Sequence, residues 1–420
     1  VTVKDSDEFD LAALTLSGNL IVTSSGGSIT DSGALAISGT SSFTTSTSNE
    51  DITLNTTTNA FTGAVTLNTT GLTGNAEVDG GTTKLDIAAS SVGGNLTLTG
   101  GNVLGITNDS GIVTVGGDLT ATTDANSGVI NMLNLAVDGS ISLVTNGTGD
   151  ATVKNDDGLE FATTTVGGDL QATATAGNII QSGALDIEGT TTLITATSNA
   201  DIILGTASNA FTGEVTLNTT GSTGNATLNS GTTALQLGTY SATTTATSVG
   251  GNLAITAGAA VTDLDALTVG GTTTISASGV DVTLNSAAND FQGAVAIDGA
   301  NVTVVDANDI ILGTSTVTGT TTGYDITATG GGVTQSSGTA LTVRGVTTIS
   351  AGGNVTLDTA ANDFQAAVAI DGVSVTVVDA GAIELGTSTV TGNYVVTATA
   401  DGDITNSGVL TITGTATFTA

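Results

Sequence analysis

The sequence predicts an all-β protein, a right-handed parallel β-helix (β-solenoid) of about 17 coils of roughly 20–26 residues, with some longer loops. Three observations indicate this fold class. A glycine motif recurs along the whole chain, apolar and polar residues alternate between the motifs, and the 420 residues include 59 Gly but no Pro. We expect one continuous solenoid over residues 1–420, without a separate domain.

The glycine motif consists of an apolar residue, any residue and then Gly. Sixteen steps lead from the first motif to the last, and in one copy Ala366 replaces the glycine. The mean step is roughly 25 residues, the length of one coil of a parallel β-helix. We therefore expect successive motifs to lie directly over one another. The glycines are Gly18, Gly39, Gly63, Gly94, Gly117, Gly139, Gly168, Gly189, Gly213, Gly251, Gly271, Gly293, Gly319, Gly345, Gly392 and Gly414.

A slower period lies over this motif. The block Asn59–Gly63 returns 150 positions later, and related blocks follow at residues 289–292 and 362–365. Counted in motifs, these gaps predict higher units of three coils or about 75 residues, with a degenerate copy near residue 136. A second phrase, Ile29–Leu35, returns at residues 179–185 and 404–410. We expect the recurring phenylalanines to pack inside the solenoid or at its corners; they are Phe61, Phe211, Phe291 and Phe364.

The segments between the motifs alternate in polarity, as in Asn95–Thr99 and Asn354–Asp358. Alternation with a period of two places aliphatic residues on one face of a strand and Thr, Asn or Asp on the other. Strands of four to six residues are too short to bury a face alone, whereas stacked coils bury it continuously. Pro would remove a hydrogen-bond donor from such a ladder, which accounts for its absence.

Composition argues against disorder and against helices. The mean hydropathy is +0.32 and β-branched residues abound, which is untypical of disordered chains. No apolar stripe of helical period is sustained, and Gly at one residue in seven disfavours helices.

The charge balance limits the partners. Four basic against 38 acidic residues give a net charge of −34, so nucleic acid is not expected as a partner. No apolar run is long enough to enter a membrane. The absence of Cys excludes disulfides and thiolate metal sites. The chain opens without a signal peptide and ends within a motif, so we expect a fragment or a processed piece.

Several phrases resemble the β-strand repeats of giant filamentous-haemagglutinin-like bacterial proteins. They are Val-Gly-Gly-Asn-Leu, Gln-Ser-Gly-Ala-Leu, Ala-Asn-Asp-Phe and the stretch Asp306–Val317. This resemblance implies a right-handed parallel β-helix, export to the bacterial surface, and a role in adhesion, filaments or matrix.

Two functions are therefore expected of this chain. The first is a structural extracellular rod or filament shaft whose uncapped ends continue into further repeats or associate end to end with other copies. The alternative is an adhesin segment that binds a surface glycan or protein through loops leaving the solenoid. The longest intervals, Gly63–Gly94 and Gly213–Gly251, are the predicted sites of such loops, the second including Leu237–Ser241.

Enzymatic activity is not expected. The chain has no His or Cys, and Arg344 is its only arginine, so the usual general base and thiol nucleophile are absent. The acidic clusters at residues 5–8 and 156–157 recur 150 positions apart, which is typical of architecture and not of a unique catalytic pair. We predict no catalytic residue.

No cofactor is expected either, with calcium left as an alternative. Asp306, Asn308 and Asp309 have hard oxygen ligands on a turn, the type that Ca²⁺ prefers. The nonapeptide array of calcium-binding β-rolls is absent, however, and turns explain Asn and Asp without a metal. Thr runs such as residues 163–165 would suit an ice-binding face only at a constant place in every coil, which they lack.

Overall fold

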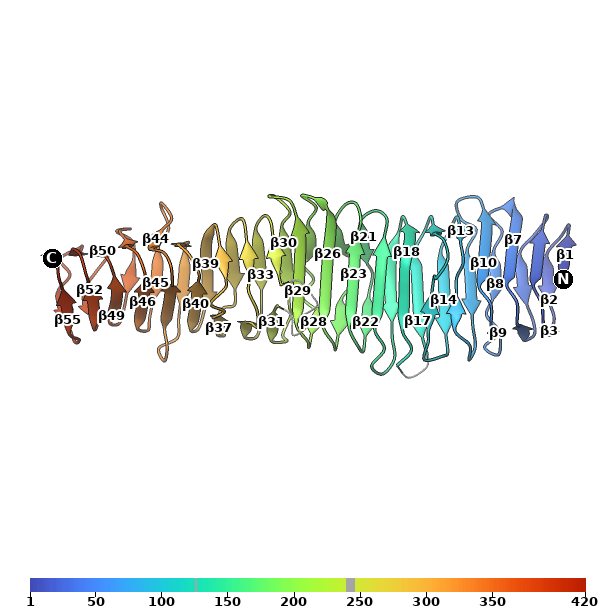
Figure 1. The fold of residues 1–420 in the computed structure, drawn as a ribbon, viewed down its shortest axis with the longest axis horizontal. Coiled ribbons are helices and arrows are strands. Elements are labelled where there is room, and N and C mark those ends of the chain that lie inside the picture. Colours follow the sequence, from blue (N-terminus) through green and yellow to red (C-terminus); the bar gives the residue numbers. More distant parts are fainter. Residues whose placement is uncertain (125–126, 239–245) are drawn as a thin grey trace. The chain divides into compact units, whose positions relative to one another are not determined.

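The computed structural model describes residues 1–124, 127–238 and 246–420. The regular elements in these ranges are β-strands, and none of the described residues belongs to a helix able to cross a membrane. The chain divides into two compact units, Val1–Gly213 (unit 1) and Glu214–Ala420 (unit 2). Each unit is a parallel β-solenoid (Figure 1), which confirms the predicted fold class, with about 19 turns in all against the 17 expected.

In unit 1 the strands form two long sheets, A and B, and a small sheet C. Sheet A contains β1 Thr2–Asp5, β4 Leu20–Ser24, β7 Ser41–Ser48, β10 Val65–Thr70, β12 Leu85–Asp86, β13 Ser90–Val92, β15 Ile106–Thr107, β16 Val113–Val115, β18 Ile130–Val137, β20 Ala151–Asn155, β23 Leu170–Ala174 and β26 Thr191–Ser198. Sheet B contains β2 Phe9–Leu11, β5 Ile29–Asp31, β8 Ile52–Leu54, β11 Ala76–Asp79, β14 Leu96–Gly100, β17 Leu119–Thr123, β19 Ser140–Val144, β21 Leu159–Phe161, β22 Thr164–Val166, β24 Ile179–Gln181, β25 Leu185–Ile187, β27 Ile202–Leu204 and β28 Ala210–Phe211. Sheet C contains β3 Leu14–Leu16, β6 Leu35–Ile37 and β9 Ala60–Phe61.

Unit 2 has strands of the same two kinds. Sheet A contains β29 Val215–Thr220, β31 Leu235–Leu237, β32 Ser248–Val249, β34 Val261–Asp263, β35 Thr268–Val269, β37 Val282–Leu284, β38 Asp290–Phe291, β40 Val302–Asp306, β43 Tyr324–Ala328, β46 Thr347–Ala351, β49 Val368–Gly372, β51 Ile383–Leu385, β52 Ser388–Val390, β54 Ile404–Asn406 and β55 Leu410–Ile412. Sheet B contains β30 Ala226–Asn229, β33 Leu253–Thr256, β36 Thr273–Ser276, β39 Ala294–Gly299, β41 Ile310–Leu312, β42 Ser315–Val317, β44 Val333–Gln335, β45 Leu341–Val343, β47 Val355–Leu357, β48 Asp363–Phe364, β50 Val375–Asp379, β53 Tyr394–Ala398 and β56 Ala416–Thr419.

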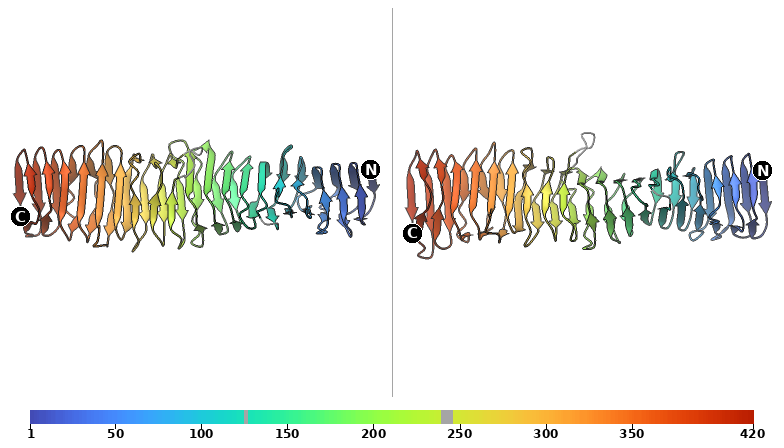
Figure 2. Two further views of the ribbon diagram at one scale, coloured as in Figure 1. Left: turned by 60° about the horizontal axis from the view of Figure 1, so that its bottom comes forward. Right: turned by 90° about the horizontal axis from the view of Figure 1, so that it is seen from below.

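Within each unit, strands of successive turns pair in parallel and in register, and Figure 2 shows them stacked side by side. In β14 and β17, for example, Leu96 pairs with Leu119 and Leu98 with Ala121. These aliphatic residues are fully buried, and the intervening Thr97 and Thr120 face outward. The alternation in the sequence therefore produces the core, because every inward residue lies on an equivalent residue one turn away.

A typical turn has one long strand on one sheet and two short strands, separated by a bend, on the other side. For several turns the long strand of each turn lies on the same sheet. Then two long strands follow one another along the chain, one on each sheet, and in the next turns the long strand lies on the other sheet. We call these places changeovers; they lie at residues 65–79, 140–155, 215–229, 294–306 and 368–379. At a changeover a long strand is followed, one turn later, by two short ones: β19 pairs with both β21 and β22.

The changeovers correct the predicted unit of three coils. Seven steps of parallel pairing lead from β1 to β20, which occupy equivalent places in the repeat of 150 positions. Half of this repeat, the predicted higher unit, is therefore three and a half turns. Each changeover adds half a turn that contains no glycine motif. Counting motifs consequently underestimates the number of turns.

The glycine motifs do stack, but in short ladders and not along one line. A methyl group added at Gly189 would meet the carbonyl carbon of Gly168 at 2.5 Å, and one added at Gly213 would meet the oxygen of Gly189 at 2.4 Å. Only glycine allows this approach of two backbones. The ladders are residues 18/39/63, 94/117/139, 168/189/213, 251/271/293, 319/345 and 392/414. Within unit 1, Gly39 and Gly189 precede strands of sheet A, whereas Gly117 precedes a strand of sheet B.

The degenerate copy differs locally. Where other copies of the repeat have two short strands, β18 runs unbroken for eight residues, and its pairing is irregular between Met132 and Leu135. Leu135 takes the place of the buried Asn found at residue 59 in the first copy. The four recurring phenylalanines are all buried, and Phe61 packs edge-on against Phe43 with ring centroids 6.2 Å apart.

Candidate functional site

Buried polar side chains gather next to the changeovers, where bends interrupt the backbone ladders. Asn59, Asn209, Asn289 and Asn362 are at most 2 % exposed. The side-chain oxygen of each accepts an N–H from the preceding turn, donated by Leu35, Leu185, Leu267 and Leu341 over 2.8–3.0 Å. Leu35, Leu185 and Leu341 begin the second short strand of their turns, and Leu267 directly precedes that strand, β35. The Asn side chain therefore replaces an acceptor that the bend removes from the ladder.

Each of these asparagines is held by a partner in the turn beneath it. The amide of Asn289 donates to Asp263 over 2.7 Å, and that of Asn59 donates to Asp31 over 2.7 Å. In the other two copies the partner is a glutamine, as in the Asn362–Gln335 pair, which exchanges two hydrogen bonds of 2.6 and 3.0 Å. The residue at this position, Asp or Gln, provides an acceptor opposite the Asn amide in all four of these copies.

A hydroxyl replaces a second missing acceptor on the other side of each changeover. The N–H of Ile297 donates to Ser315 Oγ over 3.0 Å, and that of Ile370 donates to Ser388 Oγ over 3.0 Å. Thr164 accepts from Leu143 in the same way. All three hydroxyl residues are buried and lie in or beside the bend between two short strands. The changeover is thus built from side chains that complete broken ladders.

The last short strand before a changeover has an open edge that a further residue caps. The carboxylate of Asp306 accepts the N–H of Phe291 over 2.7 Å, and Asp379 accepts that of Phe364 over 2.7 Å. In unit 1 Asn155 caps the end of the long strand β18, with its Oδ1 accepting the N–H of Val137 over 2.9 Å. Burial raises the pKa of the Asp306 and Asp379 carboxyls, although the backbone N–H groups that they accept act in the opposite direction.

The residues considered for calcium binding serve this architecture. Both oxygens of Asp306 accept backbone N–H groups, the second from Asn308 over 2.6 Å. Asp309 accepts the N–H of Gly332 in the next turn over 2.6 Å, and the Asn308 amide donates to Asp290. In the described ranges no three carboxylate or other metal-binding side chains converge. The structure therefore does not bring Asp306, Asn308 and Asp309 together as one ligand set.

The other residues noted in the sequence lie as follows. Arg344 is exposed on the outside of its turn, whereas Tyr324 and Tyr394 are completely buried and their phenols have raised pKa values because of that burial. The interval Gly63–Gly94 is a changeover containing β10 to β13 and not a loop that leaves the solenoid. In the second long interval, residues 239–245, with Tyr240 and Ser241, lie outside the described residues.

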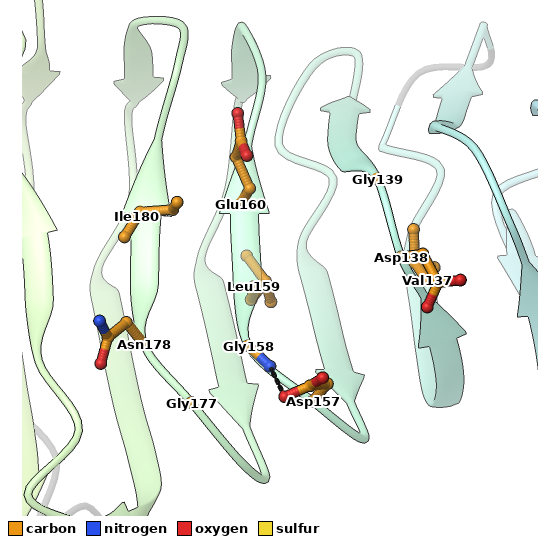
Figure 3. A pocket seen from close by; sticks show the side chains of 10 residues that line it. All are labelled: Val137, Asp138, Gly139, Asp157, Gly158, Leu159, Glu160, Gly177, Asn178 and Ile180. Atoms are coloured by element: carbon orange, nitrogen blue, oxygen red, sulfur yellow. Dashed lines mark hydrogen bonds between the residues drawn. The ribbon is translucent and has the colours of Figure 1, made fainter.

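Two acidic grooves lie on the outside of the solenoid, each beside the strand edge that precedes a changeover. Figure 3 shows the first, of about 360 Å³, with carboxylates from Asp138, Asp157 and Glu160. Asp157 accepts the N–H of Gly158 over 2.9 Å, and Glu160 projects from β21. An equivalent groove of about 390 Å³ in unit 2 contains Asp363, Asp379 and Glu384. Such grooves attract cationic groups.

Sequence reasoning did not identify the buried Asn pairs or the hydroxyl acceptors. The signal was present, because Ile29–Leu35 ends its strand with Asp31 and residues 179–185 end theirs with Gln181, one turn before Asn59 and Asn209. The joint recurrence of the two phrases, one coil apart, reflects this pairing.

Comparison with known proteins adds one match. A family model described as Repeats of unknown function (DUF5649) matches residues 1–68, 148–218, 223–298, 299–371 and 372–420. Each of the three internal matches is close in length to the unit of three and a half turns, and several begin or end within a changeover. The unmatched residues 69–147 contain the degenerate copy. No curated protein and no solved structure matches the chain.

Proposed function

Because the chain belongs to the family described as Repeats of unknown function, we propose that this structural repeat protein is a non-catalytic shaft segment on the surface of a bacterial cell. The observation that carries the proposal is the use of its buried polar groups. The Asn side chains and hydroxyls beside the changeovers accept N–H groups that the bends leave without a ladder partner. These polar groups serve to continue the backbone ladders across each changeover.

Three further features support the location outside the cell. The phrases shared with filamentous-haemagglutinin-like exoproteins favour export. The net charge of −34 keeps a long repetitive surface hydrated and apart from other acidic surfaces. A chain without Cys avoids unwanted thiol chemistry in an oxidising environment.

Immunogold electron microscopy tests this role. Antibodies raised against residues 1–420 would be applied to intact producing cells and, separately, to thin sections. The proposal predicts labelling of surface material on intact cells. Labelling confined to the cell interior in sections, with bare intact cells, would contradict it.

A further inference from the structure

The two long sheets of unit 1 differ in charge. The strands of sheet A carry Lys4, Asp5, Asp86 and Lys154, so their formal charges cancel. The strands of sheet B carry six carboxylates and no basic residue: Asp10, Asp31, Glu77, Asp79, Glu160 and Asp186. The outward side chains of sheet A are otherwise mostly Thr, Ser, Asn and Gln. Sheet A is therefore a neutral face in a strongly acidic protein.

The two lysines of sheet A are available to a partner. Both side chains are exposed, and neither forms an ion pair within the described part of the chain. Lys84, by contrast, pairs with Asp109 one turn away. Two exposed cations that form no ion pair in the described part of the chain, among 38 carboxylates, suit a negatively charged partner surface.

The positive and negative groups share one spacing. Lys4 and Lys154 are equivalent positions of the repeat of 150 positions and lie seven turns apart on sheet A. Asp10 and Glu160 are likewise equivalent and lie seven turns apart on sheet B. With strands about 4.8 Å apart, both spacings are about 34 Å.

We propose that a second copy of this chain docks laterally, with sheet A of unit 1 against sheet B of unit 1 of its neighbour. When two copies lie parallel and in register, Lys4 meets Asp10 and Lys154 meets Glu160 of the neighbour at the same time. Lys154 then enters the groove that Asp138, Asp157 and Glu160 form (Figure 3). Short Thr and Ser side chains let the faces approach closely with little loss of side-chain freedom.

This contact joins two different surfaces, so every docked copy still offers a free sheet A or sheet B. Heterologous contacts of this kind continue beyond a dimer unless they close into a ring. Because the pairs are solvent-exposed, the association weakens as salt screens them. Lateral packing goes beyond the proposed shaft, which needs no sideways contact.

Sedimentation velocity of purified residues 1–420 at low and high ionic strength tests the proposal. We expect concentration-dependent species larger than a monomer at low salt and their loss at high salt. The variant Lys4→Glu/Lys154→Glu makes sheet A acidic, and Asp10→Lys/Glu160→Lys makes sheet B basic. Each variant alone should stay monomeric, and an equimolar mixture should associate again, because the reversed charges match.

The control Arg344→Gln removes a positive charge from unit 2 and should associate like the unchanged chain. Circular dichroism establishes that each variant is folded, and restoration in the mixture cannot arise from misfolded protein. A chain that is monomeric at low salt, or variants that associate as well alone as the unchanged chain does, would overturn the proposal. So would folded variants whose mixture stays monomeric.

Discussion

At the scale of single residues, one capping position is filled by either an amide or a carboxylate. Asn155, Asp306 and Asp379 each accept the last free N–H on the strand edge that precedes a changeover. Only the two aspartates bring a charge to this buried place, and burial raises their pKa. In unit 2 the fold therefore tolerates two buried carboxylates at the capping position that the amide of Asn155 occupies in unit 1.

These raised pKa values predict how stability varies with pH. The folded state binds the two protons more readily than the unfolded chain, whose Asp pKa is about 3.9. Protonation of the two carboxyls therefore contributes to the free energy of unfolding. This contribution is complete below the unfolded pKa and is lost as the pH rises through the folded pKa. The midpoint of thermal unfolding should therefore fall with rising pH less in Asp306→Asn/Asp379→Asn than in the unchanged chain.

Thermal unfolding followed by circular dichroism at a series of pH values measures this difference. Asp10→Asn, at an exposed position, is the control for the loss of a charge alone. Parallel profiles for the double variant and the unchanged chain would show that the caps do not titrate as described.

A second residue-scale prediction concerns hydroxyls in the core. Thr273 and Thr347 begin β36 and β46, each the third of four consecutive long strands on its sheet, and their buried hydroxyl oxygens have no hydrogen-bond partner among the described residues. Leu119 fills the same place in unit 1. Thr273→Val and Thr347→Val should each stabilise the fold by about 1 kcal/mol, because an unpaired buried hydroxyl is replaced by a methyl group.

Thr164→Val is the matched control, since the hydroxyl of Thr164 accepts the N–H of Leu143. Its loss leaves a buried donor unpaired and should destabilise by about 1–3 kcal/mol. Urea denaturation gives all three values. Equal destabilisation by the three substitutions would contradict the distinction between paired and unpaired hydroxyls.

At the scale of elements, the glycine ladders set how closely successive turns approach. Gly189→Ala would place a methyl group 2.5 Å from the backbone of Gly168, whereas Gly18→Ala meets nothing within 4 Å. We expect Gly189→Ala to destabilise by about 1–3 kcal/mol or more, as overpacking does. Gly18→Ala should be neutral or slightly stabilising. Denaturation midpoints that are lowered equally by both would argue against stacked glycines.

At the scale of the whole molecule, the unit of three and a half turns defines which deletions preserve the fold. Removing residues 299–371 joins Asp298 to Gly372 and so recreates the Asp–Gly pair present at both ends of that segment. This deletion should leave a folded solenoid. Removing only residues 308–371 takes out about three turns, half a turn less than the repeat. The strands after the deletion then no longer match the strands that they should pair with, and unit 2 should unfold. Far-UV circular dichroism and resistance to proteolysis distinguish the two outcomes.

The sequence predicted the strands and their stacking because both depend on local alternation and spacing. Leu96 and Leu98 are inward for the same reason that they alternate with Thr. The half-turn shift at each changeover was not predicted. The glycine motif marks the corner after two short strands, and it looks the same in the sequence whether those strands lie on sheet A or on sheet B. The return of the Asn59 block at Asn209, after 150 positions and seven turns, was the signal for it. The Asn–Gln pairs were missed because their partners lie 27–28 residues apart.

Oxidative cross-linking of engineered cysteine pairs tests the changeover most directly, because the chain has no other Cys. Across the first changeover Glu77 pairs with Thr97, whereas glycine motifs stacked along one line would place Thr97 over Thr66. The double variant Glu77→Cys/Thr97→Cys should form a disulfide rapidly, since paired positions lie within the reach of a disulfide. Rapid cross-linking of Thr66→Cys/Thr97→Cys, with none for Glu77→Cys/Thr97→Cys, would contradict the account.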